Sequence, residues 1–259
     1  MRFVLFIFMI LLSDNGFSQD DSTFLNRFLL GQELVSGNNL SAYSDIDFSS
    51  IWMTAPNHRV FGIIGSDHQR LRIKILNVTK SNDGNMKYDV FGKSMVKGNI
   101  CDFSGTIEIE AIRNFKTYHL GVDRMYADSN IQDQGILIAR YAFIENSEQS
   151  HSGTFEGFLY SKWYLDKNRM IRYDDIQSMS DGYMNNAFLG TWTNHANDST
   201  KICNWGEYRV PAANQDFDIG AGEFSPSEKY YDKGWKEYQD AWLHSNENGK
   251  RKELEMWWE

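Results

Sequence analysis

Polar and apolar side chains alternate with a period of two through much of the middle of the chain. The alternation is clearest in Arg70–Ile75 and in Thr106–Ala111. It turns one apolar face toward a core and one charged face toward water, which is typical of antiparallel strands. Turn sequences at Ser81–Gly84 and Gly98–Asn99 mark the ends of a further strand between them. The pattern therefore predicts an antiparallel meander over 60–112.

A second group of strand patterns follows a polar connection. Its apolar faces are formed by Leu137, Ala139, Tyr141 and Phe143, by Phe155, Leu159, Trp163 and Leu165, and by 187–192. Residues 166–168 are expected to form a hairpin turn that leads into a strand over 170–173. Phe158, Tyr160 and Tyr164 place aromatic rings on the opposite face of the long strand as well. Such a strand is either buried on both sides or faces a ligand.

Helical spacing is confined to the two ends of the chain. Ser22 and Thr23 can cap a short helix that carries Phe28 and Leu29 on one face. Near the other end, helical stripes are formed by Trp235, Tyr238 and Trp242, and then by Leu254, Trp257 and Trp258. These stripes are expected to hold the C-terminal segment against the sheet. The overall prediction is a mainly β protein, an antiparallel β-barrel or β-sandwich with short N- and C-terminal helices.

The first residues have the pattern of a secretory signal peptide over 1–18. Arg2 supplies a positive charge, Phe3–Leu12 is continuously apolar, and small residues at Gly16 and Ser18 fit a cleavage site before Gln19. An uncleaved anchor is the alternative, but a bilayer core needs roughly 20 apolar residues in a helix. No later segment is long and apolar enough to span a membrane. We therefore expect an exported protein, periplasmic or extracellular, with one β-rich domain over 19–259 and a possible boundary near 173–186.

Export changes the interpretation of the two cysteines. Cys101 and Cys203 would meet an oxidising compartment, in which a disulfide between them can persist. The alternative is a pair of buried thiols that pack as small hydrophobic groups.

The composition excludes some classes of function. Of 259 residues, 41% are hydrophobic and 15% aromatic, which fits a packed core and not a disordered chain. The formal net charge of -9 opposes binding to nucleic acid. The phosphate-loop, dinucleotide-binding, zinc-protease and nucleophile-elbow motifs are all missing from the sequence, and its six histidines are scattered singly.

The stretch from Cys203 to Pro226 is the most distinctive in the chain. Asp216, Asp218 and Glu223 place three carboxylates within eight residues. Such oxygens can surround Ca²⁺, but the EF-hand pattern is absent, so a turn-rich loop without a metal or other cofactor is favoured. Together with Glu207, the same acids are candidates for the carboxylate pair of a glycoside hydrolase. The ring systems that would stack on a sugar or other ligand are Trp163, Trp192 and Trp205.

Parts of the sequence resemble an uncharacterised family of exported bacterial proteins. The similar segments are Cys203–Pro211, Asp216–Pro226, Ile51–Thr54, Phe61–Gly65 and Asn99–Cys101. The resemblance covers most of the mature chain and implies no activity and no functional residue. Separately, Gly190-Thr191-Trp192 is similar to the Gly-x-Trp element of lipocalin-like barrels. In those barrels the element lies on the first strand, whereas here it lies in the last third of the chain.

These observations give two main hypotheses for function. The first is a non-enzymatic exported module that binds a small molecule, a glycan or an envelope protein, and the second is a secreted hydrolase that uses the acids between 207 and 223. A purely structural envelope component is not distinguished from the first by sequence. An aromatic-lined void inside a closed barrel would favour small-ligand binding, and an open cleft with facing carboxylates would favour hydrolysis.

Overall fold

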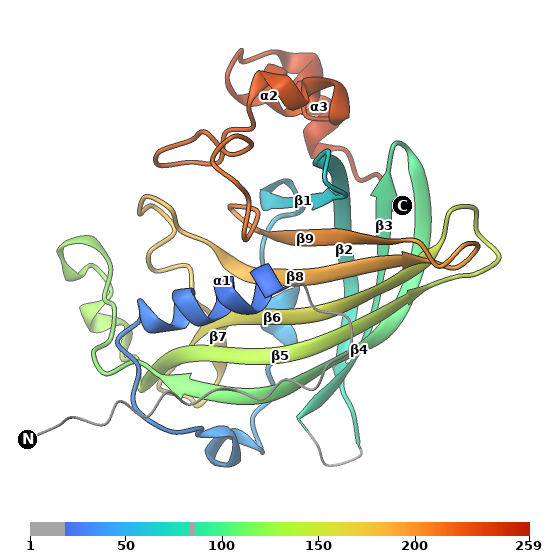
Figure 1. The fold of residues 1–259 in the computed structure, drawn as a ribbon. Coiled ribbons are helices and arrows are strands. Elements are labelled where there is room, and N and C mark those ends of the chain that lie inside the picture. Colours follow the sequence, from blue (N-terminus) through green and yellow to red (C-terminus); the bar gives the residue numbers. More distant parts are fainter. Residues whose placement is uncertain (1–18, 83–85) are drawn as a thin grey trace, which may run out of the picture.

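The chain folds into a closed antiparallel β-barrel, seen in a computed structural model that describes residues 19–82 and 86–259 (Figure 1). The strands are β1 (Val60–Ile64), β2 (Gln69–Lys80), β3 (Lys87–Val96), β4 (Asn99–Asn114), β5 (Asp133–Glu145), β6 (Gly153–Leu165), β7 (Ile171–Tyr173), β8 (Asn185–Asn194) and β9 (Thr200–Glu207). Eight of them follow one another in the order β5-β4-β3-β2-β1-β9-β8-β6, and β6 pairs with β5 to close the ring. The predicted meander is confirmed as β1 to β4. Because the sheet closes on itself, the fold is the barrel and not the sandwich of the two predicted architectures.

The helices lie at the ends of the chain, as predicted. The α-helices are α1 (Gln19–Leu30), α2 (Lys236–Trp242) and α3 (Glu247–Leu254). Short 3-10 turns occur at η1 (Leu40–Tyr43), η2 (Ser49–Trp52), η3 (Asn57–Arg59) and η6 (Glu228–Lys233), and η4 (Val122–Arg124) and η5 (Ala127–Ser129) lie in the middle of the chain between β4 and β5. Of the predicted stripe, Tyr238 and Trp242 lie on α2, and Trp235 is the residue directly before it. The second stripe is not helical, because α3 ends at Leu254 and the next residue is extended. Trp257 is nevertheless buried, so the end of the chain is held against the fold.

The sequence pattern misses β9. From Cys203 to Glu207 every residue of this strand is buried, so the polar–apolar alternation that marks the other strands is absent. The cause is the segment after β9, which covers the outer side of the barrel next to it. There Phe217, Phe224 and Trp235 pack with Phe61 of β1 in one hydrophobic cluster.

Aromatic rings fill the interior of the barrel. Phe188 and Trp205 stack with their centroids 4.6 Å apart, and Phe103 and Phe143 stack at 5.0 Å. Fully buried neighbours in the same cluster include Tyr88, Phe155 and Trp163. A barrel of eight strands encloses just enough volume for side chains of this kind. The interior is therefore a hydrophobic core, and many of the aromatic side chains of the sequence are packed within it.

A buried carboxylate organises the end of the barrel at the β3–β4, β5–β6 and β8–β9 turns. Glu145 accepts hydrogen bonds from the backbone N–H of Gly153 at 2.7 Å, from Trp192 Nε1 at 2.9 Å, and from the hydroxyl of Ser94. Burial raises the pKa of Glu145, and these three donors lower it in part. Glu145 thus connects three hairpins through hydrogen bonds, although burial of its carboxyl group is unfavourable.

The disulfide expected between Cys101 and Cys203 is not formed. Both cysteines are buried, Cys101 on β4 and Cys203 on β9. These strands stand opposite each other in the ring, with β3, β2 and β1 between them in one direction and β5, β6 and β8 in the other. A disulfide requires Cα atoms about 4.4–6.8 Å apart. The barrel would have to collapse to bring the two sulfur atoms together.

The N-terminal helix packs on the outside of the barrel. The ring of Phe28 stacks on Tyr160 of β6 with centroids 4.0 Å apart, which explains why β6 carries aromatic residues on both faces. The signal peptide predicted over 1–18 lies outside the described residues. None of the helices in the described part is long and apolar enough to cross a bilayer. The boundary suggested near 173–186 is the connection from β7 to β8 within one sheet.

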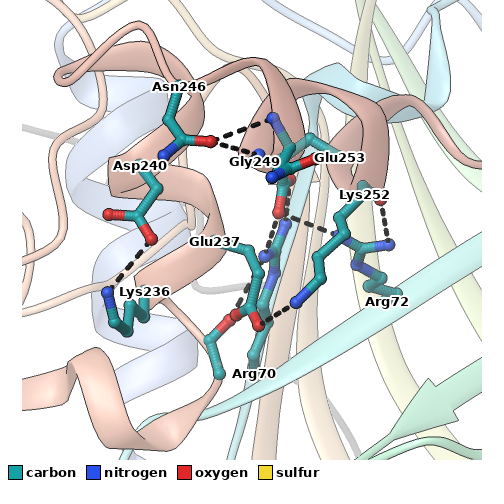
Figure 2. A network of polar contacts seen from close by, with 11 residues as sticks. Arg70, Arg72, Lys236, Glu237, Asp240, Asn246, Gly249, Lys252 and Glu253 are labelled. Atoms are coloured by element: carbon teal, nitrogen blue, oxygen red, sulfur yellow. Dashed lines mark hydrogen bonds and ion pairs between the residues drawn. The ribbon is translucent and has the colours of Figure 1, made fainter.

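The C-terminal helices are fastened to β2 by a buried ion-pair network (Figure 2). Glu253 of α3 accepts two hydrogen bonds from Arg70, at 2.7 and 2.6 Å, and one from Arg72 at 2.9 Å. The guanidinium of Arg70 also lies 4.9 Å from the ring centroid of Trp235. Burial raises the pKa of Glu253, but the hydrogen bond and charge of Arg70 and the charge of Arg72 outweigh it and hold that pKa below its usual range.

We expect Glu253→Gln to lower the free energy of unfolding by about 3 kcal/mol, because it leaves two buried guanidinium groups without their counter-charge. Urea unfolding measures the effect, with Glu148→Gln at an exposed site as the control. Since the folded-state pKa of Glu253 is depressed, its contribution is present above the unfolded-state value and disappears as the pH falls through the folded-state value. A difference between wild type and variant that stays constant into the acid range would contradict this account.

Candidate functional site

A gap in the barrel wall beside β2 holds a small pocket. β1 pairs with β2 only as far as Leu71, although β2 continues to Lys80. The chain between η2 and β1 borders the uncovered part of β2, and a pocket of about 30 Å³ lies there. Its walls include Trp52, Lys74, Asn186, Phe188, Trp205 and Glu207. The pocket is thus lined by rings from the barrel core and by four polar side chains, of which the fourth is Asn57.

Two hydrogen bonds hold η2, and with it Trp52, against the barrel. Its Nε1 donates to Ser161 Oγ on β6 at 3.0 Å. A few residues earlier, the backbone N–H of Phe48 donates to the hydroxyl of Tyr88 at 3.1 Å. These buried bonds fix η2 against the interior rings and give the pocket one rigid aromatic side.

Glu207 is the buried acid of the pocket. It ends β9 and is only 5% exposed. Its Oε1 accepts a hydrogen bond from Asn186 Nδ2 at 2.8 Å, whereas Oε2 has no partner within hydrogen-bonding geometry. Burial raises the pKa of Glu207 to about 7, although the nearby Tyr173 hydroxyl, Asn186 and the charge of Lys74 each lower it. A carboxyl group that titrates near neutrality in a pocket is a common feature of functional sites.

Asn186 reaches Glu207 because of an irregularity between β8 and β9. The pairing register breaks between Asn185 and Phe188, and Asn186 adopts a left-handed conformation with φ of 41°. Asparagine tolerates this region better than most residues. Its Nδ2 also donates to the carbonyl of Ile51 at 2.8 Å, while its Oδ1 is buried without a partner. The break in register therefore lets one side chain join the end of β9 to the segment η2.

Lys74 borders the pocket from β2. Its Nζ lies 5.1 Å from the ring centroid of Trp258, so the ammonium group makes a cation–π contact there and no ion pair with Glu207. Burial lowers the pKa of Lys74, and the charge of Glu207 raises it in part. The lysine is therefore close enough to influence the acid electrostatically without forming an ion pair with it.

The three candidate tryptophans belong to the barrel core and do not gather on an open surface. Trp163 packs edge-on against Tyr43, and Trp192 donates to Glu145. Trp205 lies 2% exposed in the interior, and it alone of the three borders the wall pocket. A stacking platform for a sugar is not formed by these rings.

The acids of the 216–223 loop point to separate partners. Asp216 pairs with Lys229 and accepts from the hydroxyl of Tyr230 at 3.0 Å. Asp218 pairs with Arg209 at 2.6 Å, and Glu223 is exposed. Within the described residues, no three His, Cys, Asp or Glu side chains are grouped so that they could hold a metal ion.

The centre of this loop is occupied by a guanidinium group. Arg209 Nη2 donates to the carbonyl oxygens of Gly220 at 2.8 Å, Gly222 at 2.9 Å and Glu223 at 3.2 Å. Asp218 completes the arrangement, since its Oδ1 accepts from the N–H of Gly220 at 3.2 Å. Of the three carboxylates that the sequence offered as a calcium cage, Asp218 alone contacts this guanidinium, and the other oxygens around it are backbone carbonyls.

We expect Arg209→Ala to release this loop. The variant removes the counter-charge of Asp218 and several donors at once, which corresponds to about 1–3 kcal/mol of stability. Limited proteolysis should then cut within 216–224 much faster than in wild type, while Arg251→Ala on the exposed side of α3 should leave the rate unchanged. Equal cleavage rates in all three proteins would show that Arg209 does not order the loop.

A larger surface groove of about 460 Å³ lies between β2–β3 and the C-terminal helices. Its charged groups are largely matched within the protein. Arg70 and Arg72 bind Glu253, and Lys252 binds Glu237 at 3.1 Å. Because the charges are balanced, the groove does not indicate the sign of a ligand, and the wall pocket is the stronger candidate.

Comparison with known proteins identifies no relative: neither a family model, nor a curated protein, nor a solved structure matches the chain. The resemblance to a family of exported bacterial proteins therefore stays a prediction, and so does the similarity of Gly190-Thr191-Trp192 to lipocalin-like barrels. The assignment of the site depends on its own geometry.

Sequence reasoning singled out Glu207 and Trp205 but missed the other residues of the pocket. Lys74 belongs to a regular alternating strand, and Trp52 lies in a segment quoted only for its family resemblance. Asn186 lies at the end of the polar stretch read as a possible domain boundary. The sequence signal for Asn186 is the asparagine pair Asn185-Asn186, which lies directly before the strand expected over 187–192 and can mark a bulge.

We expect Glu207→Gln to gain stability relative to wild type as the pH rises. The raised folded-state pKa means that the native protein binds more protons than the unfolded chain between pH 4.5 and 7, so wild-type stability falls across this range. The neutral amide avoids this cost, which approaches about 3 kcal/mol at pH 8. Urea unfolding at pH 5 and pH 8 measures it, with Glu156→Gln on the exposed side of β6 as the control. A pH-independent difference would refute the raised pKa.

Proposed function

We propose that this protein is an exported, non-enzymatic binding module that takes its ligand in the wall pocket and not in the barrel interior. The observation that carries the proposal is the pocket itself, which lies where β1 stops pairing with β2 and is lined by Trp52, Lys74 and Glu207. A hollow that combines aromatic rings with a few polar groups is the usual form of a site for a small ligand.

The filled interior supports this choice of site. Lipocalin-like barrels hold a ligand in a central cavity, whereas the rings of Phe103, Phe143, Phe188 and Trp205 stack against one another here. A ligand group that enters from the wall needs only the space next to η2 and β2. Export itself rests on the leader pattern over 1–18, and the acidic net charge supports partners other than nucleic acid.

The hydrolase alternative has one favourable observation, the near-neutral pKa of Glu207. Its mechanism needs a second carboxylate about 5–10 Å away across a cleft. Among the residues that line the pocket, Glu207 is the only acid. Asp216 and Asp218 are engaged by Lys229 and Arg209 on the outside of the barrel. The binding hypothesis therefore accounts for more of the site.

We expect a bulkier side chain in the pocket wall to abolish ligand binding without unfolding the protein. Ala55 is half-buried and lines the pocket, so Ala55→Leu fills part of it, whereas Ala42→Leu changes an exposed position on η1. Ligand-observed NMR with a panel of small amines, alcohols, carboxylates and sugars should find a class that binds wild type and Ala42→Leu but not Ala55→Leu. Equal binding to all three proteins, or no binding to any, would contradict the proposal.

A further inference from the structure

The surface groove between β2–β3 and the C-terminal helices is large enough to hold a small ligand. Its volume of about 460 Å³ falls in the range of about 300–1,000 Å³ that is typical of ligand sites. The wall pocket, at about 30 Å³, is far smaller. The charges around the groove balance in sum but are not paired evenly, and this uneven pairing indicates the class of ligand that the groove suits.

The sheet side of the groove has an excess of positive charge. Arg70 and Arg72 share the single carboxylate of Glu253, as Figure 2 shows. Burial and the charge of Arg70 lower the pKa of Arg72, and the charge and hydrogen bond of Glu253 offset this only in part. Two guanidinium groups thus repel each other across one counter-charge. An anion beside Arg72 would relieve this repulsion.

Lys97 adds a second positive charge to the same side. It forms the two-residue turn between β3 and β4 together with Gly98, and both residues have left-handed backbones, with φ of 53° and 80°. The lysine is exposed, borders the groove and has no ion-pair partner among the residues that the structure describes. Met95 faces the groove from β3, in register with Arg72. An acidic ligand group therefore finds two positive charges and an apolar contact here.

The helix side of the groove carries acids instead. Glu255 directly follows α3, is exposed and has no ion-pair partner within the described part of the chain. Asp232 of η6 lies 3.8 Å from Lys233, whose ammonium group is also 3.5 Å from Asp67. One lysine is thus shared by two carboxylates. A positively charged ligand group is matched on this side of the groove and is repelled on the other.

We propose that this groove binds a zwitterion, an amino acid or short peptide whose carboxylate lies against Arg72 and Lys97 and whose ammonium group lies against Glu255. Pairs of this kind form charge-assisted hydrogen bonds, and guanidinium groups suit carboxylates in particular. A ligand with one charge satisfies one side of the groove and leaves the other unpaired. The groove is separate from the wall pocket, so the inference goes beyond the proposed function and does not depend on it.

Isothermal titration calorimetry with alanylalanine tests the inference. Its N-acetyl derivative keeps only the carboxylate, and its C-terminal amide keeps only the ammonium group. We expect alanylalanine to bind wild type at least about tenfold more tightly than either blocked form, because it alone engages both sides of the groove. Equal affinity of alanylalanine and either blocked form, or no binding of alanylalanine, would overturn the proposal.

Two exposed positions test the two sides of the groove. Lys97→Met and Glu255→Gln should each weaken alanylalanine binding about three- to tenfold. In Glu255→Gln, N-acetylation of the probe should matter less than it does in wild type, a change that a purely structural role of Glu255 would not produce. Lys167→Met and Glu148→Gln, the same substitutions at exposed turns elsewhere, should match wild type. Thermal unfolding verifies that all variants are folded, and an unchanged affinity in either test variant is incompatible with the proposed orientation.

Further arms identify the source of the ligand and the site. L-alanine that binds as tightly as alanylalanine indicates a free amino acid, whereas tighter binding of alanylalanine or trialanine indicates a peptide, and both results support the zwitterion site. Ala55→Leu, which fills part of the wall pocket, should bind alanylalanine as wild type does. Loss of binding in Ala55→Leu would place the ligand in the wall pocket and refute the groove assignment, while the proposed function would stand.

Discussion

Eight strands that close into a ring set the volume that side chains must fill. The composition of the core and the position of the wall pocket both depend on this constraint. The ring is completed by the pairing of β5 with β6, and tryptophan, tyrosine and phenylalanine rings occupy its inside. β1 is too short to cover the whole length of β2. The wall must therefore be completed by the irregular segment before β1, and the wall pocket lies at this junction.

Three buried glutamates show how the same side chain takes different roles according to its neighbours. Glu253 meets two guanidinium groups, which hold its pKa low and make it an anchor for the C-terminal helices. Glu145 meets three neutral donors, and its pKa remains raised. Glu207 has one partnered oxygen and a pKa of about 7. The least satisfied of the three is the one that borders a pocket, which agrees with the proposal that this pocket is a binding site.

The segment after β9 covers part of the outside of the barrel with a second hydrophobic cluster. Phe217, Phe224 and Trp235 cover β1, and Arg209 fills the turn-rich loop between them with its guanidinium group. The acids of this loop thereby act in local structure. Glu207 lies apart from these acids, at the end of β9 and among the residues of the barrel core.

The sequence by itself determined the class of fold, because period-two alternation and turn residues are local properties that β2, β3, β4, β5 and β6 display directly. It also located the terminal helices and named Glu207 and Trp205. Tertiary structure alone decided that the sheet closes, that Cys101 and Cys203 stand on opposite strands, and that Asn186 and Lys74 meet Glu207 at one pocket. These outcomes depend on strand order and on a break in register between β8 and β9. Both involve contacts between residues far apart in the chain, and such contacts produce no periodic pattern in the sequence.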